Sequence, residues 1–209
     1  MPFVVVIFSV AVGCVVGANI WRLGPRTERR FRTPAGYAAL VITVILYITM
    51  ALVTDNWALM IAGWILIAGL MSASWIDLLT HTLPRQLSYA ILFLGLPFLI
   101  AAALIDDSLR RIGPSFGGLV LATVIVGILY LIGRGALGAG DVRLAPTLGL
   151  YLGWHGLRAV YYGIFLGFIA AAGVSLMLIL TRKLTRKDEI PMGPFLVAGT
   201  LAVFIGATN

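Results

Sequence analysis

Hydrophobic residues along this chain form long runs that short polar segments interrupt. Most of the runs are long enough to cross the hydrocarbon core of a bilayer as a helix. Hydrophobic residues make up 61% of the 209 positions, and a soluble domain of this size cannot bury so much apolar surface. The sequence therefore predicts an all-α fold, a polytopic membrane helix bundle formed by one domain, 1–209. Its expected spans, about eight in all, are 3–20, 37–53, 57–76, 88–105, 117–133, 144–157, 160–180 and 191–207.

The positions of the basic residues predict how these spans are oriented. Of the fifteen Lys and Arg residues, twelve lie in alternate polar segments: in 22–32, at Arg85, at Arg134 and Arg143, and in 182–187. Because positive residues are retained on the cytoplasmic side, those segments are expected to be cytoplasmic and both termini to lie on the outer side. The net charge of +7 is then explained by topology. The lipid bilayer, and not nucleic acid, is the expected partner of this basic chain.

The run 144–157 is short for a crossing, at about 21 Å for a rise of ~1.5 Å per residue. A re-entrant segment would also fit this length. However, if the segment did not cross, the basic segment 182–187 would fall on the outer side. A helix that starts near Gly140 gains about one turn and can cross where the bilayer thins, so a crossing is expected.

Two of the eight acidic residues, Asp77 and Asp141, lie where an apolar run meets a polar segment. The predicted topology places both on the cytoplasmic face. A carboxylate at a membrane boundary is costly unless it is solvated or paired, so each is a candidate functional residue. Two such residues on one face suggest a shared task.

Two neighbouring carboxylates cannot easily both ionise, so such a pair shares one proton. The ionised member can take a proton from water, and the protonated member can protonate an amide, which is aspartic-protease chemistry without a metal or another cofactor. The helix dipole predicts that Asp141, near a helix start, is the ionised base and that Asp77, near a helix end, is the acid. Gly138 and Gly140 would let a peptide backbone approach closely.

Three other residues are informative. Pro84 disfavours helix at Leu83, so the chain is expected to turn or re-enter there. Cys14 is the only cysteine, which excludes an internal disulfide and a cysteine-based zinc site. His81 stands in a polar loop, where a single histidine is more often a surface residue than a ligand.

Four segments, in the same order, resemble those of the type IV prepilin leader peptidases, which are multi-span aspartic proteases of the GxGD type. In 16–23, V-G-A-N-I-W-R-L resembles the exit of the family's first helix. Asp77 is followed after five residues by Leu83-Pro84, as in the first catalytic segment. The segments 138–144, G-A-G-D-V-R-L, and 190–195, I-P-M-G-P-F, resemble the second catalytic segment and the closing segment.

The resemblance implies that Asp77 and Asp141 are the catalytic pair and that Gly138, Gly140, Arg143 and Pro84 shape the site. The implied substrate is a prepilin-like precursor whose short basic leader precedes a hydrophobic helix. Cleavage would occur at the cytoplasmic face of a bacterial cell membrane.

This chain departs from the family pattern in three places. Arg143 replaces a usual Lys and keeps the charge, whereas Arg85 stands where Asn or Asp is common. Larger family members carry a Cys-rich insertion after the first helix and methylate the new N-terminus. The corresponding segment, 22–34, is short and lacks cysteine, so a protease without the methyltransferase activity is predicted.

Two other functions fit the composition. A small ion-coupled transporter could use Asp77 and Asp141 to bind ions, but it would be expected to show inverted repeats and acids near mid-membrane. A non-catalytic membrane subunit of a secretion or pilus machine could keep the fold without activity. Retention of both aspartates and the flanking glycines argues against this second alternative.

Overall fold

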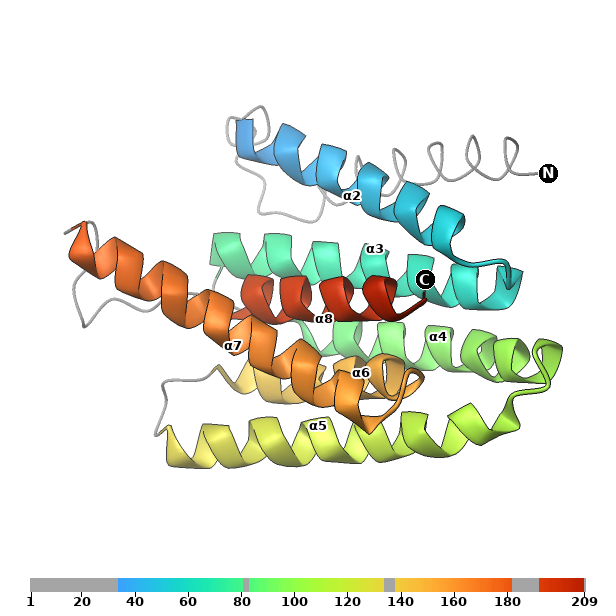
Figure 1. The fold of residues 1–209 in the computed structure, drawn as a ribbon. Helices are drawn as coiled ribbons and strands as arrows, with labels where there is room; N and C mark the ends of the chain where they lie inside the picture. Colours follow the sequence, from blue (N-terminus) through green and yellow to red (C-terminus); the bar gives the residue numbers. More distant parts are fainter. Residues whose placement is uncertain (1–33, 81–82, 134–137, 182–191, 209) are drawn as a thin grey trace.

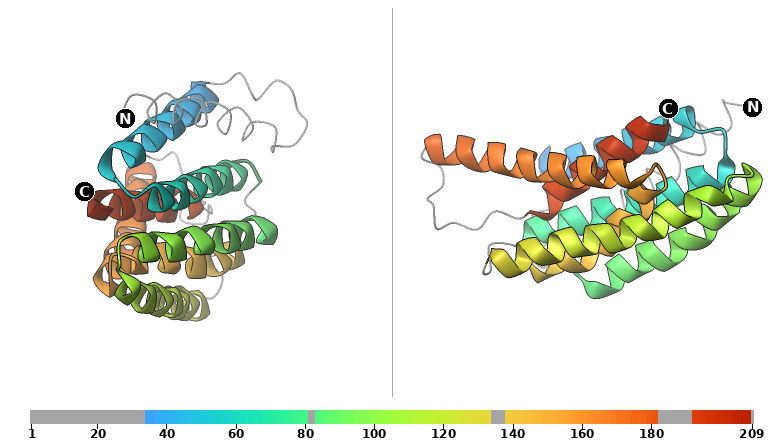
Figure 2. Two further views of the ribbon diagram at one scale, coloured as in Figure 1. Left: turned by 90° about the vertical axis from the view of Figure 1, so that its right-hand side faces the viewer. Right: turned by 60° about the horizontal axis from the view of Figure 1, so that its bottom comes forward.

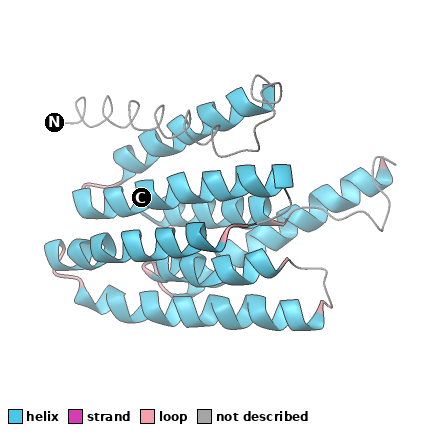
Figure 3. Ribbon diagram, turned by 180° about the vertical axis from the view of Figure 1, so that it is seen from behind, coloured by secondary structure: helices cyan, strands magenta, loops and turns pink. Residues whose placement is uncertain are grey.

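The computed structural model describes residues 34–80, 83–133, 138–181 and 192–208, so the expected span 3–20 and His81 lie outside the described residues. The described part of the chain is entirely helical, with loops and turns between the helices and no strand (Figure 3). Its elements are α2 (Pro34–Val53), α3 (Trp57–Thr80), α4 (Arg85–Ile105), η2 (Leu109–Arg111), α5 (Ile112–Ile132), α6 (Ala139–Gly153), α7 (Leu157–Leu180) and α8 (Gly193–Thr208). Each α-helix coincides with one of the expected apolar runs, and an all-α architecture is confirmed for these residues.

The helices run back and forth along one common direction, with α2 at one edge of the bundle and α5 at the other (Figure 1). Between these edges lie α3, α8, α4 and α6, and α7 packs on α8 and α6. Two further views show the same order of helices (Figure 2). This alternation brings the end of α3 and the starts of α4, α6 and α8 together, at the left of Figure 1.

Four segments in the described part of the chain are long and apolar enough to cross a membrane: Trp57–Leu78, Arg85–Ile105, Leu109–Ile132 and Leu157–Leu180. Two further apolar helices, Tyr37–Val53 and Gly193–Thr208, are shorter. The protein is therefore a multi-pass membrane protein. The total of about eight spans, the crossing of 144–157 and the outer position of both termini stay predictions.

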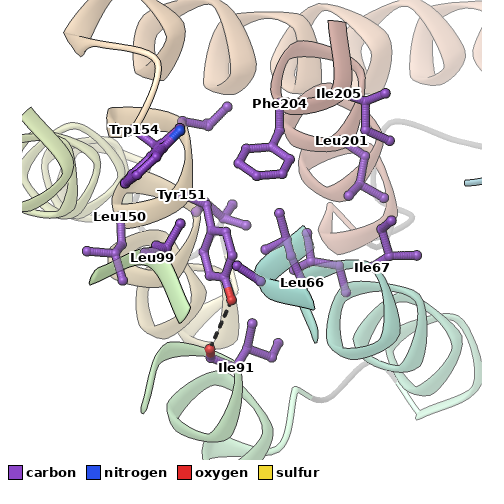
Figure 4. Close-up of a cluster of buried hydrophobic side chains, with 14 of the residues drawn as sticks. Leu66, Ile67, Ile91, Leu99, Leu150, Tyr151, Trp154, Leu201, Phe204 and Ile205 are labelled. Carbon is purple, nitrogen blue, oxygen red and sulfur yellow. Dashed lines mark hydrogen bonds between the residues drawn. The ribbon is translucent and has the colours of Figure 1, made fainter. Parts of the chain in front are cut away.

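Helix α6 lies in the interior of the bundle, and every residue from Thr147 to Gly153 is buried. Figure 4 shows Tyr151 at the centre of the surrounding apolar cluster, where its hydroxyl donates to the carbonyl of Ile91 on α4 at 3.4 Å. The ring of Phe204 on α8 meets the Tyr151 ring edge-on, with centroids 5.7 Å apart. Contacts with several neighbouring helices thus hold α6 in place.

Glycines bring the backbones of α5 and α6 into direct contact. A Cβ atom added at Gly153 would lie 2.8 Å from Cα of Ser115 on α5, which leaves no room for a side chain. Gly149 and Gly118 face each other in the same way one turn along. Close approach through small residues is a main source of helix association in lipid, and it fixes the position of α6 against α5.

Candidate active site

Asp77 lies three residues before the end of α3, and only 7% of its surface is exposed. The start of α8 covers its carboxylate: a Cβ atom added at Gly193 would lie 2.6 Å from Oδ2 of Asp77. A glycine at this position lets the backbone of α8 come within contact distance of the carboxylate. Asp77 is therefore enclosed by two helices that are far apart in the sequence.

Asp141 occupies the third position of α6, after the extended N-cap residue Gly138. A backbone hydrogen bond from Gly138 reaches its carboxylate, as the acidic residue of a capping box accepts from the N-cap amide. Asp141 is 4% exposed, and its Oδ1 atom is buried with no hydrogen-bond partner among the described residues. The local turn chemistry of a helix start thus fixes this side chain but leaves one oxygen unsatisfied.

Leu83 connects the surroundings of the two aspartates. A Cβ atom added at Gly140 would lie 2.6 Å from Cβ of Leu83, and one added at Gly193 would lie 3.4 Å from its Cδ1 atom. Leu83 is thus wedged between the glycine that precedes Asp141 and the glycine that touches Asp77. The end of α3 and the starts of α4, α6 and α8 converge here on one small region.

The two carboxylates influence each other's ionisation. Burial raises the pKa of Asp141, which lies in the first turn of α6 and outside the four long apolar segments, to about 6. The negative charge of Asp77 raises this pKa further, and the hydrogen bond from Gly138 acts in the opposite direction. Loss of hydration thus opposes the expected assignment of Asp141 as the ionised member, which rested on the helix dipole.

The other predicted site residues differ in how they lie relative to the aspartates. Gly138 and Gly140 adjoin Asp141, and a Cβ atom at Gly138 would lie only 3.3 Å from Oδ2 of that residue. Pro84 is exposed and extended at the start of α4, and Leu83 before it is not helical, which confirms the predicted interruption of the helix at Leu83. Arg143 is half-buried two positions after Asp141, so it lies on a different side of α6.

Gly193 and Leu83 line the site although sequence analysis did not select them. Both stand in segments that the sequence analysis had singled out, 190–195 and Leu83-Pro84, so a signal was present. Their roles depend on which helix ends meet in space. The order of motifs along the chain does not give that information.

Comparison with known proteins gives consistent matches over most of the chain. The type IV leader peptidase family matches residues 64–207. A prepilin leader peptidase/N-methyltransferase of Aeromonas hydrophila is 31% identical over 171 residues, which are 79% of this chain and 57% of that protein. A protein of the same name from Burkholderia pseudomallei (strain K96243) is 30% identical over 148 residues, which are 71% of this chain and 47% of that protein. Another, from Escherichia coli (strain K12), is 34% identical over 131 residues, which are 63% of this chain and 56% of that protein.

The chain spans about half the length of the curated relatives it matches. No solved structure matches it significantly.

Proposed function

The chain belongs to the type IV leader peptidase family, and we propose that it is an aspartic endopeptidase that removes the basic leader from prepilin-like precursors. Asp77 and Asp141 are the proposed catalytic pair. The observation that carries the proposal is their burial at one end of the bundle, close enough for the charge of Asp77 to raise the pKa of Asp141. A bacterial cell membrane, with the site at its cytoplasmic face, is the proposed location.

The reaction follows from one proton shared by the two carboxyl groups. Ionised Asp77 removes a proton from a water molecule, whose oxygen attacks the scissile carbonyl carbon. Protonated Asp141 donates to the carbonyl oxygen as the tetrahedral intermediate forms. When the C–N bond breaks, the proton gained by Asp77 passes to the leaving amine. Transfer back from the intermediate restores the proton on Asp141.

The surroundings of the aspartates suit a peptide substrate. Gly138 and Gly140 leave space beside Asp141, so a peptide backbone can approach its carboxyl group. Burial lowers the local polarity, which strengthens the hydrogen bonds that stabilise the intermediate. A positively charged leader would stay at the cytoplasmic face and thereby hold the scissile bond at the depth of the aspartates.

The proposal covers the peptidase reaction and not methyl transfer. The relatives named as both peptidase and N-methyltransferase are longer than this chain. The segment 22–34 offers no Cys-rich insertion of the kind associated with the second activity in larger members. Prepilin-type precursors are therefore proposed to leave this enzyme cleaved and with an unmodified new N-terminus.

Co-expression with a candidate prepilin from the same genome tests the proposal, with loss of the leader followed as a gel shift. We expect cleavage by the wild type and none by Asp77→Asn or Asp141→Asn, although both variants insert into the membrane at wild-type levels. Asp106→Asn is the matched control, because Asp106 is an exposed acid at the other end of the bundle, and it should cleave normally. Cleavage by both active-site variants would refute the two-aspartate mechanism.

A further inference from the structure

A groove of about 760 Å³ runs between α2, α3 and α8. Its walls are almost entirely apolar and include Ile42 and Leu46 of α2, Leu78 of α3, and Val197 of α8. Figure 1 shows α2 inclined to α3 and α8 along this side of the bundle. The volume is close to that of two turns of an α-helix about 10 Å wide.

One wall of the groove consists of small residues. Ala198, Ala202 and Gly206 recur every fourth position along α8, and all three are exposed. Such a stripe lets another helix approach closely in lipid. Opposite it, Ile42 is 49% and Leu78 is 52% exposed. The groove is thus open along its side.

One end of the groove adjoins the aspartate end of the bundle. Trp75 and Leu78 of its lining flank Asp77 on α3. Pro194 of its lining follows Gly193, which touches the carboxylate of Asp77. A segment that lies in the groove therefore ends beside the residues next to Asp77 and Gly193.

Two residues of the groove lining carry a buried hydrogen-bonding atom that has no partner among the described residues: Oγ of Ser74 and Nε1 of Trp75. Each of these residues is 8% exposed. A buried serine in a helix usually donates to the carbonyl four residues earlier, as Ser72 does to Ala68 at 2.6 Å. Ser74 does not, and an unsatisfied buried donor is costly. Both groups lie within one turn of Asp77.

We propose that this groove binds the hydrophobic helix of the prepilin substrate and that Ser74 and Trp75 donate to the extended backbone just ahead of that helix. The inference rests on the proposed function, since it names the path by which that substrate enters. A continuous helix or a lipid chain offers no free backbone carbonyl to these donors. A peptide that unwinds to reach Asp77 offers free backbone carbonyls, because they have lost their hydrogen-bond partners in the helix.

Crosslinking tests the docking path independently of cleavage. The parent carries Cys14→Ala and Asp141→Asn, so the substrate is held uncut and no native thiol competes. Ala202→Cys is added on the groove wall, and Ala172→Cys, an exposed position on α7 outside the groove, is the matched control. Each is oxidised with a prepilin that carries one cysteine in its hydrophobic segment. We expect a covalent enzyme–prepilin adduct with Ala202→Cys and at least tenfold less with Ala172→Cys.

Equal yields at the two positions, or no adduct with a prepilin that wild-type enzyme cleaves, would overturn the proposal. A second arm of the experiment uses an enzyme that keeps native Cys14 and also carries Ala202→Cys. An intramolecular adduct that excess prepilin does not suppress would show that the chain's own segment 3–20 fills the groove, which also refutes it. A prepilin that forms the adduct but is never cut by the wild type would refute the proposed function and leave the docking path supported.

Kinetics test the two donors. Ser74→Ala and Trp75→Phe should each lower kcat/KM for the prepilin by about fivefold, as expected for one lost hydrogen bond. Ser72→Ala on the same helix is the control and should match the wild type, because Ser72 lies outside the groove. If both donor variants keep the kcat/KM of the wild type, Ser74 and Trp75 do not belong to the binding surface.

Discussion

The end of the bundle that holds the aspartates differs from the opposite end in how polar groups are satisfied. At the opposite end, Asn56 accepts from the backbone amides of Ala58 and Leu59 at 2.9 and 3.2 Å and thereby caps α3. Its amide nitrogen also donates to the carbonyl of Ala102 on α4 at 3.1 Å. One side chain thus closes a helix start and ties two helices together.

Other contacts strengthen that opposite end. The guanidinium of Arg111 lies over the ring of Trp154, 5.4 Å from its centroid. Nε2 of His155 and Oγ1 of Thr208 lie within hydrogen-bonding distance at 3.2 Å, and the His155 ring packs edge-on against Phe204. Burial, and to a lesser degree the charge of Arg111, lowers the pKa of His155 to about 4, so this histidine is neutral at pH 7.

The aspartate end instead keeps buried polar atoms without partners in the described structure, among them Oδ1 of Asp141 and Oγ of Ser74. The contrast is one of degree, since Oγ of Ser108 and Nε1 of Trp154 at the opposite end are also unsatisfied. Each such group costs about 1–3 kcal/mol. The comparison teaches that this bundle is stabilised at the capped end and is left ready for a ligand at the other.

Gly193→Val should reduce prepilin cleavage by about 100-fold or more, because its Cβ atom would displace the carboxylate of Asp77. The rate of leader loss per folded enzyme measures this effect. Gly173→Val on α7 is the matched control, since a Cβ atom there meets nothing within 4 Å. Cleavage by Gly193→Val at the wild-type rate would show that displacement of the Asp77 carboxylate does not impair the site.

The cleavage rate should fall about tenfold per pH unit above the pKa of Asp141, which is about 6, because the acid loses its proton. Below that pH the rate should level off, because Asp141 is then protonated. Initial rates between pH 4 and 8 in detergent test this profile. A cleavage rate that rises between pH 6 and 8 would show that Asp141 acts as the base.

Asn56→Ala should lower the free energy of unfolding by about 1–3 kcal/mol, because both the cap of α3 and the bond to Ala102 are lost. The thermal midpoint in detergent measures this loss. Cleavage per folded molecule should not change, since the site is at the other end. Asp55→Ala replaces the exposed neighbour and should leave both quantities unchanged. A selective loss of activity in Asn56→Ala would show that the two ends are coupled.

The two ends should respond to pH with opposite signs, each by about 1 kcal/mol between pH 7 and 5. Because burial raises the pKa of Asp141 to about 6, its contribution to stability is present at low pH and is lost as the pH rises through 6. Because the pKa of His155 is lowered to about 4, its contribution is present at high pH and is lost as the pH falls.

Thermal midpoints at the two pH values separate these contributions. Relative to the wild type, Asp141→Asn should lose more stability on acidification and His155→Gln should lose less. The same pH response in the wild type and both variants would show that neither group sets it.

The sequence was sufficient to predict the helices and the meeting of the aspartates. Long apolar runs can form only helices in lipid, and alternating basic segments placed Asp77 and Asp141 on one face. The raised pKa of Asp141 was not predictable, because it depends on burial, which the helix dipole does not report. The groove was not predictable either: α2 is apolar throughout, so no pattern showed how α2, α3 and α8 would be spaced.

The glycine contacts of α6 have a mechanical consequence. Gly149 and Gly153 lock α6 against α5, and Tyr151 joins it to α4, so Asp141 stands on a rigid support. Asp77 stands on the helix that forms a wall of the open groove. Any strain that a bound molecule introduces there therefore moves Asp77 relative to a stationary Asp141. A compound too wide for the groove that entered beside Trp75 would therefore shift one carboxyl group against the other, and so inhibit the enzyme without touching either of them.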